Sequence, residues 1–112
     1  MERTLAAMAV EVLTTAEGRE KTALGRRYAA EWFAARAAGT PLPVGLAEPP
    51  LRPARPARPE LLPPREVPRR RPGSPQGRIA LLHALAHIEL NAVDLHWDII
   101  ARFTHHPMPA GF

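Results

Sequence analysis

The 112-residue chain contains no cysteine and no long run of apolar residues. The absence of cysteine excludes a disulfide framework and any thiolate metal or redox site. A membrane-spanning helix needs about 18 consecutive apolar residues, and the chain contains no such run. The alanine-rich N-terminus is too weakly apolar for a secretory signal. The sequence therefore predicts a soluble, cytoplasmic protein with no membrane partner.

Lysine and aromatic residues are also scarce. Lys21 is the only lysine, so the positive charge behind the net +4 comes almost wholly from arginine. Aromatic residues make up 5% of the chain. An excess of arginine, alanine and proline is most simply the mark of a GC-rich genome. The arginine-rich segment holds no aromatic residue on which bases could stack. Nucleic acid is therefore not expected as a partner.

Proline, by contrast, is abundant and concentrated. Twelve of the 14 prolines lie between Pro41 and Pro75, a density that excludes a helix or a central strand there. The chain is therefore divided into residues 1–39, a helical hairpin, residues 40–73, an extended connector, and residues 74–112, one long helix. The predicted fold is all-α, and its helices offer few apolar residues from which to build a core that is stable on its own. We expect the apolar faces to need a partner or further chain.

The sequence of residues 1–39 predicts two helices. Thr4 can cap a helix of about three turns. The end of this helix is marked by Thr14, Thr15 and Gly18. A second helix begins near Glu17 and ends at Gly39, a natural residue for a helix C-terminus. It carries three large side chains about one turn apart, at Leu24, Tyr28 and Trp32.

The connector alternates proline with arginine and favours polyproline II geometry. One interpretation is a docking strip, in which the charge of the arginines between Arg52 and Arg71 and the preset backbone bind nucleic acid, another acidic partner or a proline-binding module. The interpretation that we favour is a semi-rigid connector that wraps a helical body. Its apolar residues would pin it there, namely Leu61, Leu62 and Val67.

The last part begins with a strong helix signal, Ser74 as N-cap followed by Pro75 at the first helical position. We expect an uninterrupted helix to about Phe103 or Thr104, roughly 40 Å long. At about 100° per residue, Glu89 falls within its apolar stripe. The stripe comprises Leu82, Leu85, Ala86, Ala92, Val93, Ile100 and Phe103.

A carboxylate in such a stripe needs a partner when it is buried. One interpretation of Glu89 is a buried salt bridge to an arginine. The other is a metal ligand in a helical bundle, where carboxylates from several helices point inward. His96 lies seven residues further, about 10 Å along the axis, and is too far away to share a metal with Glu89.

Two histidines, His83 and His87, are spaced as two imidazoles must be to bind one metal from a single helix. The glutamate of an H-E-x-x-H zinc site is absent, since Ala84 follows His83. Paired histidines on a helix more often make surface or core hydrogen bonds. Asp94 lies on the same side as His87 but too far along the axis to share an ion.

Residues 77–95, GRIALLHALAHIELNAVDL, resemble the signature of an uncharacterised bacterial family, domain of unknown function 455. The connector segments RPARPEL (55–61) and PREVPRR (64–70) are also similar to that family. The resemblance implies a ferritin-like helical bundle with a dinuclear iron or manganese centre. Glu89 would be its first-helix carboxylate ligand, with His83 and His87 in ligand or supporting roles.

Members of that family are much longer and continue with a Glu-x-x-His pair that this chain lacks. The resemblance therefore implies an N-terminal part of a bundle protein, which we expect to be inactive alone and to bind no metal tightly. Its partners would be the remaining bundle helices or further copies of itself. For the intact protein the resemblance implies oxidative chemistry, and the alternative is a non-catalytic interaction protein that uses the arginine–proline strip to bind an acidic partner.

Overall fold

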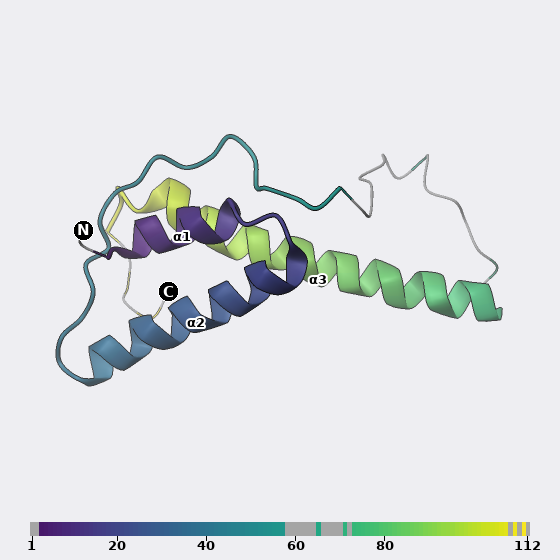
Figure 1. Cartoon of the computed structure of the whole chain (residues 1–112), viewed down its shortest axis with the longest axis horizontal. Coiled ribbons are helices and arrows are strands. Elements are labelled where there is room, and N and C mark those ends of the chain that lie inside the picture. The colour runs from purple at the N-terminus through teal and green to yellow at the C-terminus, as the bar shows by residue number, and fades with distance from the viewer. Residues whose placement is uncertain are drawn as a thin grey trace.

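The computed structural model describes residues 3–57, 65, 71, 73–107, 109 and 111. It contains three helices, α1 (Leu5–Leu13), α2 (Gly18–Ala37) and α3 (Pro75–Phe103), and the described residues form no strand. The molecule is elongated, with extents of 53 × 28 × 22 Å (Figure 1). The predicted all-α class is confirmed.

Helix α1 packs against both α2 and α3 and supplies most of the core. The Thr4 hydroxyl accepts a hydrogen bond from the Ala7 amide at 3.1 Å, which confirms the predicted N-cap. Five of the nine residues of α1 are buried because α2 and α3 cover it on two sides, namely Ala6, Met8, Ala9, Val12 and Leu13.

Two apolar clusters join the three helices. In the first, Met8 and Val12 of α1 contact Tyr28 of α2, and Trp97 of α3 packs against this cluster. In the second, Ala9 and Leu13 contact Ala101 of α3. Both clusters use the C-terminal half of α3, so the core lies at that end of the long helix.

Helix α2 begins and ends as the sequence predicts. The Glu17 carboxylate caps it by accepting a hydrogen bond from the Glu20 amide, and this bond lowers the pKa of Glu17. The chain leaves the helix through Gly39, whose φ of 79° is a conformation that favours glycine. Gly25 is buried in the middle of α2, where a Cβ atom would lie 3.0 Å from the indole nitrogen of Trp97. Glycine therefore permits the close approach of α2 and α3.

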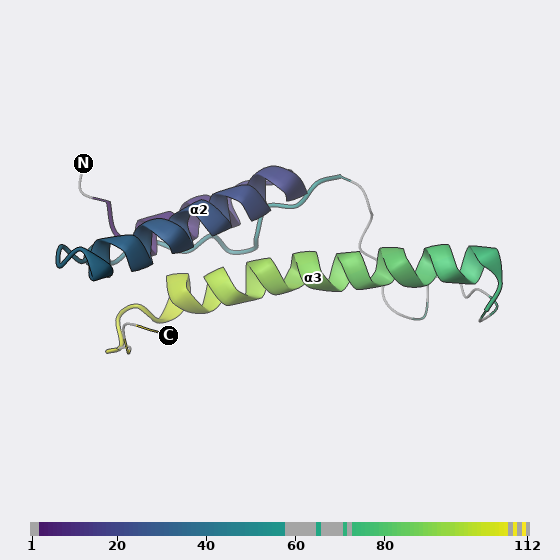
Figure 2. The ribbon, with the colours of Figure 1, turned by 90° about the horizontal axis from the view of Figure 1, so that it is seen from below.

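Helix α3 is continuous over its 29 residues, as predicted, and the Ser74 hydroxyl caps it by accepting from the Gly77 amide at 3.0 Å. Its N-terminal half projects past the ends of α1 and α2 (Figures 1 and 2). Several large apolar side chains of this half are exposed as a result. Within the described part of the chain, no helix combines the length and apolar character needed to cross a bilayer.

Residues 40–57 of the connector are extended and have no regular secondary structure, as predicted. It is fixed by backbone hydrogen bonds to α1. The Leu5 amide donates to the Pro43 carbonyl at 3.0 Å, and the Ala54 amide donates to the Leu13 carbonyl at 2.7 Å. The expected apolar pins, Leu61, Leu62 and Val67, lie outside the described residues.

A buried ion pair ties α2 to α3. Lys21 is 1% exposed and Asp94 is 5% exposed, and the Lys21 ammonium binds the Asp94 carboxylate. The same ammonium donates a hydrogen bond of 2.8 Å to the Ala54 carbonyl of the connector. Three segments far apart in the sequence thus meet at the only lysine of the chain.

We predict that breaking this pair is costly. Asp94→Asn or Lys21→Met leaves one charge buried without its partner, which costs about 3 kcal/mol or more in the free energy of unfolding. The double variant Lys21→Met/Asp94→Leu should recover at least half of that loss, because neither charge remains. Urea denaturation followed by circular dichroism measures these differences.

The control is Arg27→Met, which removes an exposed pair with Glu31 at 4.0 Å and should cost no more than about 1 kcal/mol. Single variants at Lys21 and Asp94 that are no less stable than this control would contradict a buried pair.

We also predict that Gly25→Val separates α2 from α3. The valine side chain collides with Trp97, and overpacking of this kind costs about 1–3 kcal/mol. The control Ala23→Val introduces the same β-branched residue at an exposed position of the same helix and should cost only about 0.5 kcal/mol. Thermal unfolding temperatures test the prediction, and equal losses at the two positions would refute the close contact.

Candidate metal centre

One side of α3 is polar and faces the connector. Its residues recur at helical spacing and comprise His87, Asn91, Asp94, Asp98 and Arg102. Arg102 binds the Asp98 carboxylate at 2.8 Å and donates to the Pro50 carbonyl. Together with the pair of Lys21 and Asp94, these contacts fix the connector along the helix.

Arg55 of the connector occupies the middle of this polar side. One guanidinium nitrogen donates to the Asn91 side-chain oxygen, and the other lies 2.8 Å from Nε2 of His87. Because a guanidinium can only donate, Nε2 of His87 must be the acceptor. A metal ion at that nitrogen would have to displace Arg55. His87 therefore has a structural role in this arrangement.

The structure does not bring the three predicted ligands together. His83 is exposed, and His87 is half-buried beneath Arg55. Glu89 lies about 160° around α3 from His87 and about 120° from His83. Among the residues that the structure describes, no three or more histidine, aspartate or glutamate side chains form a group able to hold a metal.

Glu89 is exposed, on the apolar face of α3 that the sequence predicted would need a partner or further chain to cover it. Helices α1 and α2 pack against a different side of α3, where Asp94 and Ala101 are buried. Glu89 makes no ion pair with any residue that the structure describes, so the alternative of a salt bridge to an arginine is not seen among those residues. Its role as a metal ligand stays a prediction.

The buried carboxylate is instead Asp94, and its cation is Lys21 rather than an arginine. A signal for the burial of Lys21, though not for its partner, was present in the sequence. Lys21 precedes Leu24, Tyr28 and Trp32 by three, seven and eleven residues, so it shares their side of α2. A lone lysine on an apolar helix face needs a buried anion, and this pattern indicates one.

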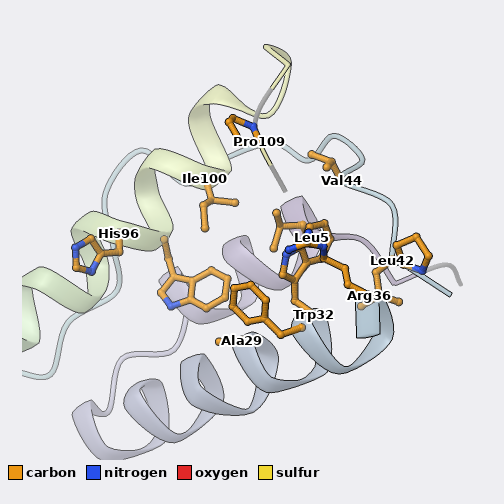
Figure 3. Close-up of a pocket in the computed structure, with 12 residues that line it drawn as sticks. Leu5, Ala29, Trp32, Arg36, Leu42, Val44, His96, Ile100 and Pro109 are labelled. Carbon is orange, nitrogen blue, oxygen red and sulfur yellow. The ribbon is translucent and has the colours of Figure 1, made fainter. Parts of the chain in front are cut away.

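An apolar cavity of about 430 Å³ lies between α2 and the C-terminal half of α3. Figure 3 shows Ile100 of α3 and Trp32 of α2 among the residues that line it. His96 and Arg36 are the titratable residues of its wall, and Leu5 of α1 also contributes. Such a wall suits an apolar group rather than a metal ion.

Comparison with known proteins gives a limited set of relatives. No solved structure matches the chain. A protein of Haemophilus influenzae (strain Rd), described as "Uncharacterized protein", is 46% identical over 48 residues. That match covers 43% of this chain and 17% of the relative, so the chain spans a small part of the relative's length. The family described as "Protein of unknown function (DUF455)" matches residues 14–112, and the chain belongs to that family.

Proposed function

We propose that this chain is part of a ferritin-like helical protein in which α3 contributes Glu89 to a dinuclear metal centre. The observation that carries the proposal is the exposed carboxylate of Glu89 at the middle of a 29-residue helix, beside exposed Leu82 and Leu85. A carboxylate within an apolar surface is the arrangement by which bundle helices present ligands to a shared metal pair.

The chemistry of the donor favours iron or manganese. A carboxylate oxygen is a hard ligand, and two such carboxylates can bridge two metal ions. This chain would supply one of the ligands, and other helices would supply the rest. Most of the Haemophilus relative lies outside the match, which leaves room in that protein for further helices.

The two histidines receive different roles. Arg55 binds Nε2 of His87, so we assign His87 to holding the connector on α3. His83 is exposed one turn earlier and stays a candidate ligand. Arg55 is also one of the arginines that the rival docking strip would need, and its contacts with α3 support the connector interpretation.

The test uses a full-length family member that carries the equivalent glutamate. Its replacement by glutamine removes the charge and one bridging oxygen, so bound iron or manganese should fall at least about tenfold. Metal analysis of the purified, folded protein measures the change. The control is the equivalent of Asp94→Asn, which should lower stability and leave the metal content of folded protein unchanged. Equal metal content in the glutamine variant and the parent would refute the ligand role.

For the 112-residue chain itself we predict no tight, stoichiometric binding of iron or manganese, because one carboxylate cannot hold a hard cation alone. Titration calorimetry with Fe²⁺ and Mn²⁺ measures this. Tight binding that is lost on replacing His83 and His87, and is indifferent to Glu89→Gln, would assign the site to the histidine pair instead.

A further inference from the structure

The apolar cavity between α2 and α3 has no part in the proposed metal centre. Its share of α3 begins at His96, which lies about 10 Å along the axis from Glu89. Trp32, Phe33 and Trp97 line the cavity, and they are half of the aromatic residues of the chain and include both of its tryptophans. Aromatic side chains with a few polar groups are the usual lining of a site for a small organic molecule.

Four parts of the chain besides α2 contribute to the wall of this cavity. Leu5 of α1, Leu42 of the connector, Ile100 of α3 and Pro109 all line it (Figure 3). Its volume of about 430 Å³ falls within the range of roughly 300–1,000 Å³ found for small-molecule sites. A helix about 10 Å across fills about 420 Å³ in each turn of 5.4 Å, so the cavity would admit only about one turn. The size therefore fits a small molecule better than a further helix.

One cation stands in this apolar wall without a partner. Arg36 is exposed in the last turn of α2, and its guanidinium binds no carboxylate or carbonyl group among the residues that the structure describes. The helix end does not require it, because the amides of Gly39 and Thr40 already donate to the carbonyls of Arg36 and Ala35. A guanidinium can only donate hydrogen bonds, and a carboxylate is an acceptor that matches its geometry.

We propose that the cavity binds a small apolar molecule that carries one carboxylate, such as a medium-chain fatty acid. Arg36 binds the carboxylate, and the apolar part of the molecule packs against Trp32 and Ile100. His96 lies at the other end of the group of lining residues from Arg36, with its ring turned away from the other labelled side chains (Figure 3). Arg36 is therefore the cation that selects the charge of the ligand.

Intrinsic fluorescence tests the proposal directly, because both tryptophans of the chain line the cavity. Decanoate and its uncharged counterpart 1-decanol are titrated separately into the 112-residue chain, and decanoate should produce a saturable change in emission. Ala29→Leu should weaken the binding of both molecules at least about tenfold, because the larger side chain fills part of the cavity. The control Ala30→Leu makes the same change at an exposed neighbour that does not line the cavity, and it should leave both affinities unchanged.

The role of Arg36 is tested by the difference between the two molecules. Arg36→Gln should weaken decanoate binding at least about fivefold, because it removes a hydrogen bond between charged groups, and it should leave the affinity for 1-decanol unchanged. The control Arg26→Gln removes an exposed arginine of α2 that does not line the cavity, and it should affect neither molecule. Circular dichroism checks that each variant keeps the helix content of the parent chain.

Three results would overturn the proposal. The first is the absence of a saturable change with decanoate. The second is binding that Ala29→Leu leaves unchanged, because the molecule would then lie elsewhere on the chain. The third is an Arg36→Gln variant that weakens both molecules equally or neither, which would show an apolar surface of the kind that a further protein segment covers. These titrations contain no metal, so their failure is separate from a failure of Glu89 as a metal ligand.

Discussion

The buried pair of Lys21 and Asp94 determines which side of α3 faces the rest of the molecule. Two charges withdrawn from water must stay together, so α2 and α3 can pack only with these residues in contact. The Ala54 carbonyl shares the ammonium, and this bond draws the connector into the same junction. Once α3 is fixed at this point, its rotation about its own axis is fixed as well.

This rotation gives α3 three sides with different tasks. The side around Asp94 and Ala101 packs on α1 and α2. The polar side holds the connector through Arg55 and Arg102. The remaining surface is apolar, carries Glu89 and is largely exposed. The proposed metal ligand lies on this last surface because the buried pair turns it outward.

The sequence predicted the elements well and their mutual orientation poorly. Caps are local, so Thr4, Glu17 and Ser74 identified where the three helices begin. Periodicity placed Glu89 and its apolar neighbours on a common side of α3, but it did not show which side α1 and α2 cover. The contact between Lys21 and Asp94 joins positions 73 residues apart in the sequence. No local sequence pattern specifies a contact between residues so widely separated along the chain. The site residues are therefore predicted as a helix face, and the role of Glu89 as a metal ligand stays a proposal.

The most direct test of this account uses the fact that Lys21 is the only lysine. A chain labelled with ¹⁵N-lysine has a single side-chain ammonium resonance in its NMR spectrum. The account predicts that near neutral pH this resonance is sharp, because burial slows exchange of its protons with water, and that Asp94→Asn shifts or broadens it. An ammonium that exchanges as fast as that of an exposed lysine, and that Asp94→Asn leaves unchanged, would contradict the account.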